Sequence, residues 1–265
     1  MEVFLLGQQR ALAALKQWES NSTIDKSQPY ARLELVHIHA ARDHLVLIDP
    51  QQLTIEPEES LQLYEAVRPI VSEISDSVNL ESPSEWLIKA DKFESLITAS
   101  SSLAIGRNID HWIPKDGHIV GVARKWRQWQ NDIQMLWFDH PVNQRRIERG
   151  ALPINSVWIS GIGALNQIQP HSTIMQAPKI YTDSKSLRLL CNLYQLDCSE
   201  RFSRQTRFSF LHLNNPNTSI VWDRICRGLI DRVIHSIELI DFPEGQIRIR
   251  SIHKEDLISR RLLLL

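Results

Sequence analysis

The chain has 265 residues, of which 43% are hydrophobic and 23% charged, and its formal net charge is −1. This balance is typical of a globular domain and excludes a general electrostatic attraction to nucleic acid or to acidic membranes. No apolar run approaches the roughly 20 residues that a helix needs to cross a bilayer. The start, MEVFLLGQQR, lacks the basic region of a signal peptide. We therefore expect a cytoplasmic protein with neither a nucleic-acid nor a membrane partner.

Cysteine usage agrees with that location. The chain contains three cysteines, Cys191, Cys198 and Cys226, without CxxC spacing. An odd number at these spacings argues against a disulfide framework and against a zinc cluster. Reduced thiols are the preferred interpretation.

The first part of the chain alternates helical and strand-like patterns. Apolar residues three and four positions apart predict a helix over residues 4–18, and a proline followed by two acids opens another over 57–74. Between them, residues 33–39 and 44–48 are typical of two strands joined as a hairpin. This alternation indicates a protein that combines helices with sheet.

Two histidines on the first of these strands, His37 and His39, fall on the same face because strand side chains alternate. Metal-binding histidines can be arranged in this way, but a metal site needs a third ligand or carboxylates. A half-exposed sheet face is the better interpretation, and we predict no metal or cofactor. The sequence contains no Walker A motif, no GxSxG elbow and no HExxH.

Residues 122–163 are the block around which the rest of the sequence is organised. Apolar residues recur every three or four positions from Val122 to Leu136, which predicts a helix whose tryptophans pack in the core. Beside this stripe lie Asn131 and Gln134, whose amides point either into a cleft or into solvent. The pattern alone leaves both orientations open.

The second half of the block predicts a short helix and a buried strand. Pro141 suits the first turn of a helix that Gly150 ends, and the run Ile154-Asn-Ser-Val-Trp-Ile159 is typical of a buried strand. Gly161 and Gly163 come after that run, and they would cradle a phosphate if a helix began directly after them. By itself the glycine pair is a weak signal.

The last hundred residues continue the alternation of strands and helices. Short alternating runs predict strands, and Thr182-Asp183-Ser184 can cap a helix. The predicted strands cover 179–181, 207–213, 238–242 and 246–252, and the predicted helices cover 182–194 and 218–236.

Arginine and amide side chains are concentrated around the central block. Arg107, Asn143, Arg146 and Asn155 are of the types that hold a carboxylate or phosphate, because guanidinium forks and amides match its oxygens. The alternative, that they brace loops through hydrogen bonds, is equally consistent with the sequence.

An ordered series of motifs over residues 100–165 resembles a known family. The motifs are Gly106-Arg107-Asn108, Trp112-x-Pro114, Gln130-Asn131-Asp132-x-Gln134, His140-Pro-Val-Asn143-x-x-Arg146-x-x-x-Gly150 and Pro153-x-Asn155-Ser-x-Trp158-x-x-Gly161-x-Gly163. Together they are similar to bacterial regulatory proteins of the RpfE type, also labelled phosphoglycerate-mutase-like. Part of the series also resembles archaeal-type cofactor-independent phosphoglycerate mutases of the alkaline-phosphatase superfamily.

The resemblance implies an α/β fold with a mixed sheet flanked by helices, a reduced form of the alkaline-phosphatase-like fold. We expect one domain over residues 1–265, with 100–165 as its motif-bearing core. The residues expected to bind the ligand are Arg107, Asn108, Asn131, Gln134, His140, Asn143, Arg146, Asn155, Gly161 and Gly163.

The expected function is that of a non-catalytic RpfE-type protein whose pocket binds a small phosphorylated or carboxylated metabolite. The alternative is a metal-dependent phosphoglycerate-mutase-like enzyme or phosphoester hydrolase. Mutases of that kind use a serine nucleophile and two metal ions held by Asp and His. Here only Asp231-x-x-x-His235 matches the expected ligand spacing. The sequence indicates neither catalytic residues nor an oligomeric state.

Overall fold

The computed structural model describes residues 11–177, 179–182, 184–199, 210–212, 227, 237–241 and 248–252. Its contacts group into two compact units, one over Gln8–Ile168 and one that contains the described residues from Gln169 onward. The single domain expected over residues 1–265 stays a prediction.

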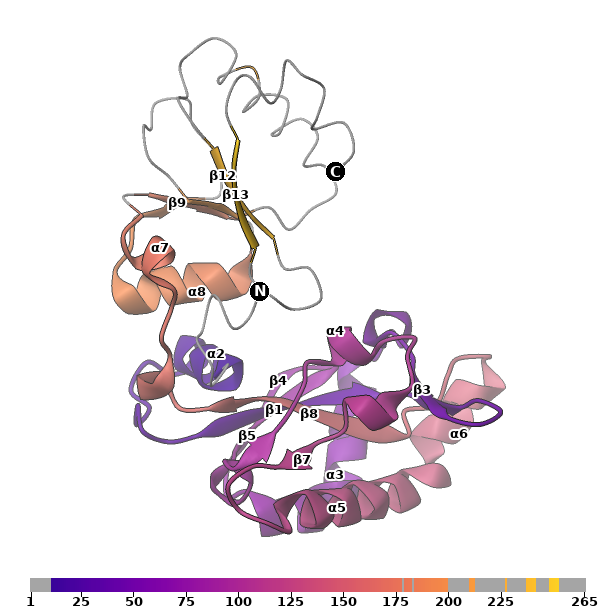
Figure 1. Ribbon diagram of the computed structural model, residues 1–265. Coiled ribbons are helices and arrows are strands. Elements are labelled where there is room, and N and C mark those ends of the chain that lie inside the picture. Colours follow the sequence, from indigo (N-terminus) through magenta and orange to yellow (C-terminus); the bar gives the residue numbers. More distant parts are fainter. Residues whose placement is uncertain are drawn as a thin grey trace. The chain divides into compact units, whose positions relative to one another are not determined.

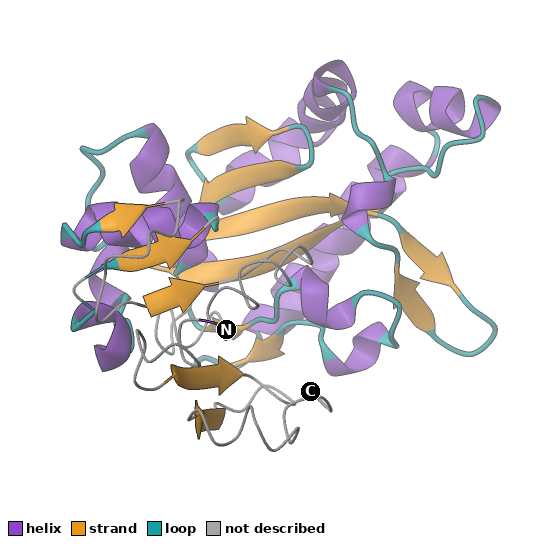
Figure 2. Ribbon diagram, turned by 90° about the horizontal axis from the view of Figure 1, so that it is seen from above, coloured by secondary structure: helices purple, strands orange, loops and turns teal. Residues whose placement is uncertain are grey.

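The first unit is built on a four-stranded sheet with the order β4-β5-β1-β8. Its strands are β4 (Val78–Ser82), β5 (Glu85–Lys89), β1 (Tyr30–Val36) and β8 (Ser156–Gly163). All three neighbouring pairs are antiparallel, and β8 forms one edge of the sheet. Figure 2 shows these strands running side by side. Two of the strands, β1 and β8, confirm strand predictions, whereas β4 and β5 lie in a stretch without a clear alternating pattern.

Two long helices, α3 (Pro57–Ile74) and α5 (Val122–Phe138), cover one face of this sheet (Figure 1). Both helices were predicted. A reciprocal capping box between Glu56 and Glu59 begins α3. The helix α5 begins after Gly121, and the carboxylate of Asp116 accepts hydrogen bonds from two amides at its start.

The main hydrophobic core lies between this face and the two helices. Strand β1 alternates strictly, so Leu33 and Leu35 point into the core while Arg32 and Glu34 point to the other face. Trp126 of α5 is fully buried in the same core, as the apolar stripe predicts. At the end of the stripe the prediction was wrong, because Leu136 is exposed and its neighbour Trp137 is the buried residue.

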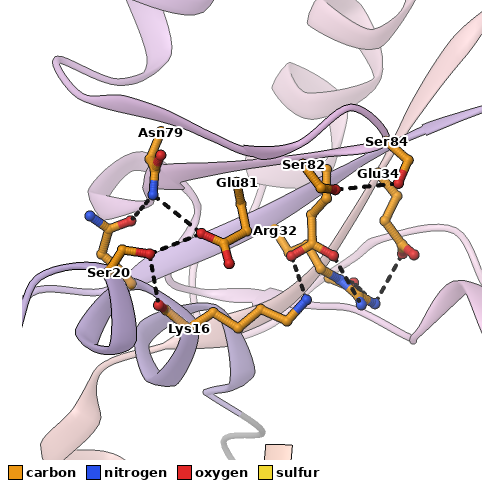
Figure 3. Close-up of polar contacts among 11 residues, drawn as sticks. Lys16, Ser20, Arg32, Glu34, Asn79, Glu81, Ser82 and Ser84 are labelled. Carbon is orange, nitrogen blue, oxygen red and sulfur yellow. Dashed lines mark hydrogen bonds and ion pairs between the residues drawn. The ribbon is translucent and has the colours of Figure 1, made fainter. Parts of the chain in front are cut away.

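A cluster of paired charges occupies the opposite face, beneath α2 (Leu12–Ser20), as Figure 3 shows. The Nζ of Lys16 lies 2.5 Å from Glu85, and Arg32 Nη2 lies 3.0 Å from Glu34. Arg32 also donates to the Ser160 hydroxyl at 2.9 Å. Burial raises the pKa of Glu34, and the charge of Arg32 opposes that shift. Pairing offsets the large cost of burying these charges.

Short elements complete the first unit. The predicted hairpin is present but begins later than expected, because the extended chain breaks at His37 between β1 and β2. Apart from short 3-10 helices, the remaining elements are β2 (Ile38–Ala40), β3 (Leu45–Leu47), β6 (Leu96–Ile97), α4 (Ser101–Ala104), β7 (Lys115–Asp116) and α6 (Pro141–Glu148).

The second unit contains a parallel sheet and a separate strand pair. The parallel sheet has the order β10-β9-β11, and β12 pairs with β13 in antiparallel fashion. Its elements are α7 (Ser172–Met175), β9 (Ile180–Thr182), α8 (Lys185–Tyr194), β10 (Cys198–Ser199), β11 (Phe210–His212), β12 (Ile237–Asp241) and β13 (Arg248–Ile252). The helix predicted over 218–236, apart from residue 227, lies outside the described residues.

The α/β class with helices flanking a sheet is confirmed. Parallel and antiparallel pairs both occur, but in separate sheets rather than in one mixed sheet. Among the residues that the structure describes, no helix is both long and apolar enough to cross a membrane.

Candidate functional site

A cavity of about 550 Å³ lies beside the edge strand β8, in the first unit. Its walls come from α5, from the chain around β2, from the first half of β8, and from the short helix η3 (Ile109–His111) with the residues after it. This volume is in the range of pockets that bind small molecules. The side chains around it are Arg127, Gln130, Asn131, Gln134, His37, His39, Asp110, Asn155, Ser156, Ile38, Ile109, Ile113, Trp126, Trp158 and Ile159, with Ala40, Leu45 and Pro114.

The α5 wall is a polar stripe. Arg127, Gln130, Asn131 and Gln134 are three, one and three positions apart, which places them on one face of the helix. The amide of Gln130 donates to the Val157 carbonyl at 2.8 Å, so it fastens α5 to the edge strand. Arg127, Asn131 and Gln134 are exposed, so their polar groups are accessible to a ligand.

The wall formed by the chain around β2 carries two histidines. His37 Nδ1 lies 2.8 Å from the carbonyl oxygen of Pro153. A carbonyl only accepts, so Nδ1 carries the proton and Nε2 of the neutral ring is an acceptor. The His39 ring stacks beside it, with ring centroids 6.3 Å apart. Both histidines therefore belong to the same wall, as their spacing predicts.

Asn155 joins this wall to β8. Its amide group donates to the Ile38 carbonyl at 2.9 Å, and its side-chain oxygen accepts from the Ile38 amide at 2.8 Å. The side chain thus imitates a strand pairing between β8 and β2. Asn155 lines the cavity, but its polar atoms already contact the protein backbone.

The floor of the cavity is apolar. Ile109 and Trp158 are almost fully buried, and the Trp158 indole donates to the Ala99 carbonyl at 2.8 Å. The two charged residues around the cavity are Arg127 and Asp110. The arrangement combines hydrogen-bonding walls with an apolar base, which suits a ligand that has both kinds of surface.

Three of the ten residues expected to bind a ligand line this cavity together: Asn131, Gln134 and Asn155. Arg107 and Asn108 lie close in sequence to its η3 wall but do not line it. The Arg107 guanidinium lies 6.0 Å from the ring centroid of Trp112. Asn108 caps η3 by accepting from the Asp110 amide at 2.9 Å.

Arg146 was expected to line an anion pocket, but it does not line the cavity. Its side chain is fully buried, with Nη1 2.6 Å from Glu59 and Nε donating to the Leu152 carbonyl at 2.8 Å. Nη2 donates to the Leu53 carbonyl. Because these acceptors occupy the guanidinium, Arg146 braces α3, α6 and the adjoining loops rather than lining the cavity.

Asn143 has the same bracing role. Its amide donates to the carbonyls of Trp137 and Ile154, and its oxygen accepts from the Ile154 amide, each at 2.8 Å. Only 1% of the residue is exposed. Asn143 and Arg146 therefore fit the alternative explanation, in which they brace loops through hydrogen bonds, better than the explanation that they hold a ligand together.

The glycine pair shapes the end of β8. Gly161 has a φ of 65° and Gly163 a φ of 152°, and a Cβ on Gly163 would lie 2.8 Å from the Cβ of Ala11. The next amide, of Ala164, donates to the side chain of Gln167 at 2.8 Å. The helix that begins there, Leu165–Gln167, has only three residues. The glycine pair thus permits a bend at the end of β8 and the close approach of Ala11 to Gly163. The longer helix that a phosphate cradle needs does not follow the pair.

His140 caps α6, because its Nδ1 accepts from the Val142 amide at 3.3 Å. Burial lowers the pKa of His140 below its ordinary value of 6.5, and the charge of Arg145 lowers it further. Protonation of Nδ1 would remove the acceptor of this cap.

The fold should therefore lose stability as the pH falls below 6.5. A histidine with a lowered pKa stabilises the fold above its unfolded pKa, and this contribution disappears as the pH falls through the folded pKa. Asparagine caps a helix without titrating, so the His140→Asn variant should lose less free energy of unfolding than the natural protein as the pH falls. Denaturant unfolding at a series of pH values measures this difference. Equal pH profiles for the two proteins would contradict the assignment.

Sequence reasoning missed Arg127, and it did not connect His37 and His39 with α5. One local signal was available: Arg127-x-x-Gln130-Asn131-x-x-Gln134 is a polar stripe beside the apolar stripe of the same helix. That stripe indicates which side chains share a face. It does not indicate that the face borders a cavity.

In the part of the chain that the structure describes, no group of three or more His, Cys, Asp or Glu side chains could hold a metal ion. The Asp231 and His235 pair singled out by its spacing lies outside the described residues.

The fold and the cavity define an α/β protein with a polar cavity at the edge of an antiparallel sheet. No family model and no curated protein matches the sequence. Among solved structures, the chain is similar to a cofactor-independent phosphoglycerate mutase from Thermoplasma acidophilum, with 15% identity and a TM-score of 0.38 over 86% of this chain and 68% of that one. It is also similar to a protein from Pyrococcus horikoshii, with 13% identity and a TM-score of 0.38 over 75% of this chain and 49% of that one. These scores are too low for either protein's activity to be assigned to this chain.

Proposed function

We propose that this chain is a non-catalytic binding protein that holds a small phosphorylated or carboxylated metabolite in the cavity beside β8. The resemblance to RpfE-type proteins implies that binding of this metabolite has a regulatory role. The observation that carries the proposal is the exposed stripe of Arg127, Asn131 and Gln134 along one wall of the cavity.

Arg127 supplies the charge for this role. A guanidinium offers several N–H donors in a fixed plane and pairs with two oxygens of a carboxylate or phosphate. The amides of Asn131 and Gln134 can each donate and accept, so they suit hydroxyl or carbonyl groups further along the ligand. The apolar floor at Ile109 and Trp158 would cover the ligand's carbon skeleton.

The experiment is a thermal-shift and calorimetry screen with inorganic phosphate, phosphorylated three-carbon acids and the same acids without phosphate. A ligand present at 100 times its Kd should stabilise the fold by about 2.7 kcal/mol. Arg127→Ala should weaken binding at least about tenfold, because it removes a charge-assisted contact. Absence of any shift across the panel in the natural protein would overturn the proposal.

Arg124→Ala is the matched control. Arg124 is also exposed on α5 but does not line the cavity. Its replacement should leave the ligand's affinity unchanged. Equal weakening by both variants would indicate attraction to the general charge of the helix rather than a defined site.

The alternative function, a metal-dependent phosphoglycerate-mutase-like enzyme or phosphoester hydrolase, is distinguished by metal content and activity. Stoichiometric, tightly bound manganese or zinc in the purified protein, together with phosphatase activity on a generic phosphoester, would overturn the non-catalytic part of the proposal. Binding of an anion without turnover would support it.

A further inference from the structure

One of the side chains that border the cavity, Trp126, carries a buried hydrogen-bond donor. Trp126 lies on α5 at the cavity wall, and its side chain is fully buried. Its Nε1 has no hydrogen-bond partner among the residues that the structure describes. A buried donor without an acceptor is costly, because it has given up its bond to water without gaining another. The missing acceptor therefore needs an explanation.

The other three buried tryptophans of the first unit each have an acceptor. Trp86 donates to a serine hydroxyl at 3.0 Å, Trp137 to a carbonyl at 3.0 Å and Trp158 to a carbonyl at 2.8 Å. Trp158 also borders the cavity, so a place in its wall does not by itself deprive an indole of its partner. Trp126 differs from all three, and an acceptor supplied by a ligand accounts for the difference.

The surroundings of Trp126 indicate which kind of acceptor fits. Its ring lies in the main hydrophobic core and meets the Phe93 ring edge to face, with centroids 5.3 Å apart. The next residue on α5, Arg127, borders the same cavity but is exposed. Because burying a charge costs far more than burying a neutral carbonyl, the charged group of a ligand suits Arg127 and an uncharged oxygen suits Trp126.

We propose that Trp126 determines the specificity of the cavity, and that the ligand is an acid that also carries a neutral carbonyl group. The acid group pairs with Arg127, and the carbonyl oxygen accepts a hydrogen bond from the Trp126 indole. This inference rests on the proposed function, since it names a class of ligand for the same cavity. An acid of equal length without the carbonyl oxygen would leave the buried donor without an acceptor after binding.

The test compares pairs of acids that differ in one carbonyl group. The probes are pyruvate with propanoate, levulinate with pentanoate, and γ-acetylbutyrate with hexanoate, each titrated into the full chain by calorimetry. In the pair whose spacing matches the cavity, the keto acid should bind about tenfold more tightly, because only it gives the buried donor an acceptor. Equal affinities within every pair would overturn this inference and leave the proposed function in place. Binding of neither member of any pair would also overturn it, and the phosphorylated acids then decide separately whether the proposed function stands.

Trp126→Phe removes the donor and keeps an aromatic ring in the core. It should bring the ratio of the two affinities in the matching pair to about one, because neither acid then gains a hydrogen bond at this position. Trp158→Phe is the matched control, since Trp158 borders the same cavity but already donates to the Ala99 carbonyl. It should change both affinities by the same factor, as should Arg127→Ala. A ratio that Trp126→Phe leaves unchanged would contradict the proposal.

A measurement on the natural chain covers the case in which Trp126→Phe does not fold. The indole N–H signals of the eight tryptophans are followed by nuclear magnetic resonance in an isotope-labelled sample. One signal should move downfield with the matching keto acid and stay in place with its partner acid, because a new hydrogen bond forms only in the first case. If the N–H of Trp126 instead points at the Phe93 ring, its signal lies upfield and neither acid moves it, which would rule out the proposed contact.

Discussion

Replacing Arg146 with alanine is expected to lower the free energy of unfolding by about 3–5 kcal/mol. The guanidinium is fully buried and pairs with Glu59 at 2.6 Å, while it also donates to the carbonyls of Leu53 and Leu152. Without it, the largely buried carboxylate of Glu59 is left with its ion pair to Arg149, and two carbonyls lose their charged donor. Breaking a buried pair costs more than the pair itself contributes. Denaturant unfolding monitored by circular dichroism measures this loss.

Arg145→Ala is the matched control for Arg146. Arg145 is the preceding residue on α6, and its exposed guanidinium donates to Gln62 at 2.7 Å. Because solvent replaces an exposed hydrogen bond readily, the control should cost less than about 1 kcal/mol. A loss of similar size in both variants would indicate that the buried network around Arg146 is not the reason for its effect.

The second large effect is expected for Trp137→Ala, which should cost about 3–5 kcal/mol. Trp137 is fully buried where α5 packs against α3, and its indole donates to the Leu63 carbonyl at 3.0 Å. Its ring meets that of Trp86 edge to face, with centroids 6.0 Å apart. The substitution removes a large apolar side chain, leaves a cavity in the core and leaves a carbonyl of α3 without its donor.

Two further variants separate the causes of the Trp137 effect. Trp137→Phe keeps most of the apolar volume but removes the donor, so it should retain more stability than the alanine variant. Phe138→Ala changes the adjacent aromatic, which is 74% exposed, and should stay within about 0.5 kcal/mol of the natural protein. A Phe138 variant as destabilised as Trp137→Ala would contradict the burial that the structure assigns to α5.

The candidate site could be predicted only in part. Asn131 and Gln134 were identified because they lie beside an apolar stripe, and helical spacing already shows which side chains share a face. Arg146 and Asn143 were expected to hold a ligand because their side chains are chemically suited to anions. The same donors suit backbone carbonyls and a buried carboxylate equally well, so residue type could not distinguish a brace from a binding site.

The sequence by itself determined the local order: the helices α3 and α5, their starts at Pro57 and after Gly121, and the strands β1 and β8. Each depends on side chains within a few residues of one another, through periodicity, capping and alternation. Only the tertiary structure decided which partners these elements meet. Glu59 reaches Arg146 from 87 residues away, and the polar stripe of α5 borders a cavity because β8 is an edge strand. Such contacts depend on the register and packing of distant segments, which no local pattern specifies.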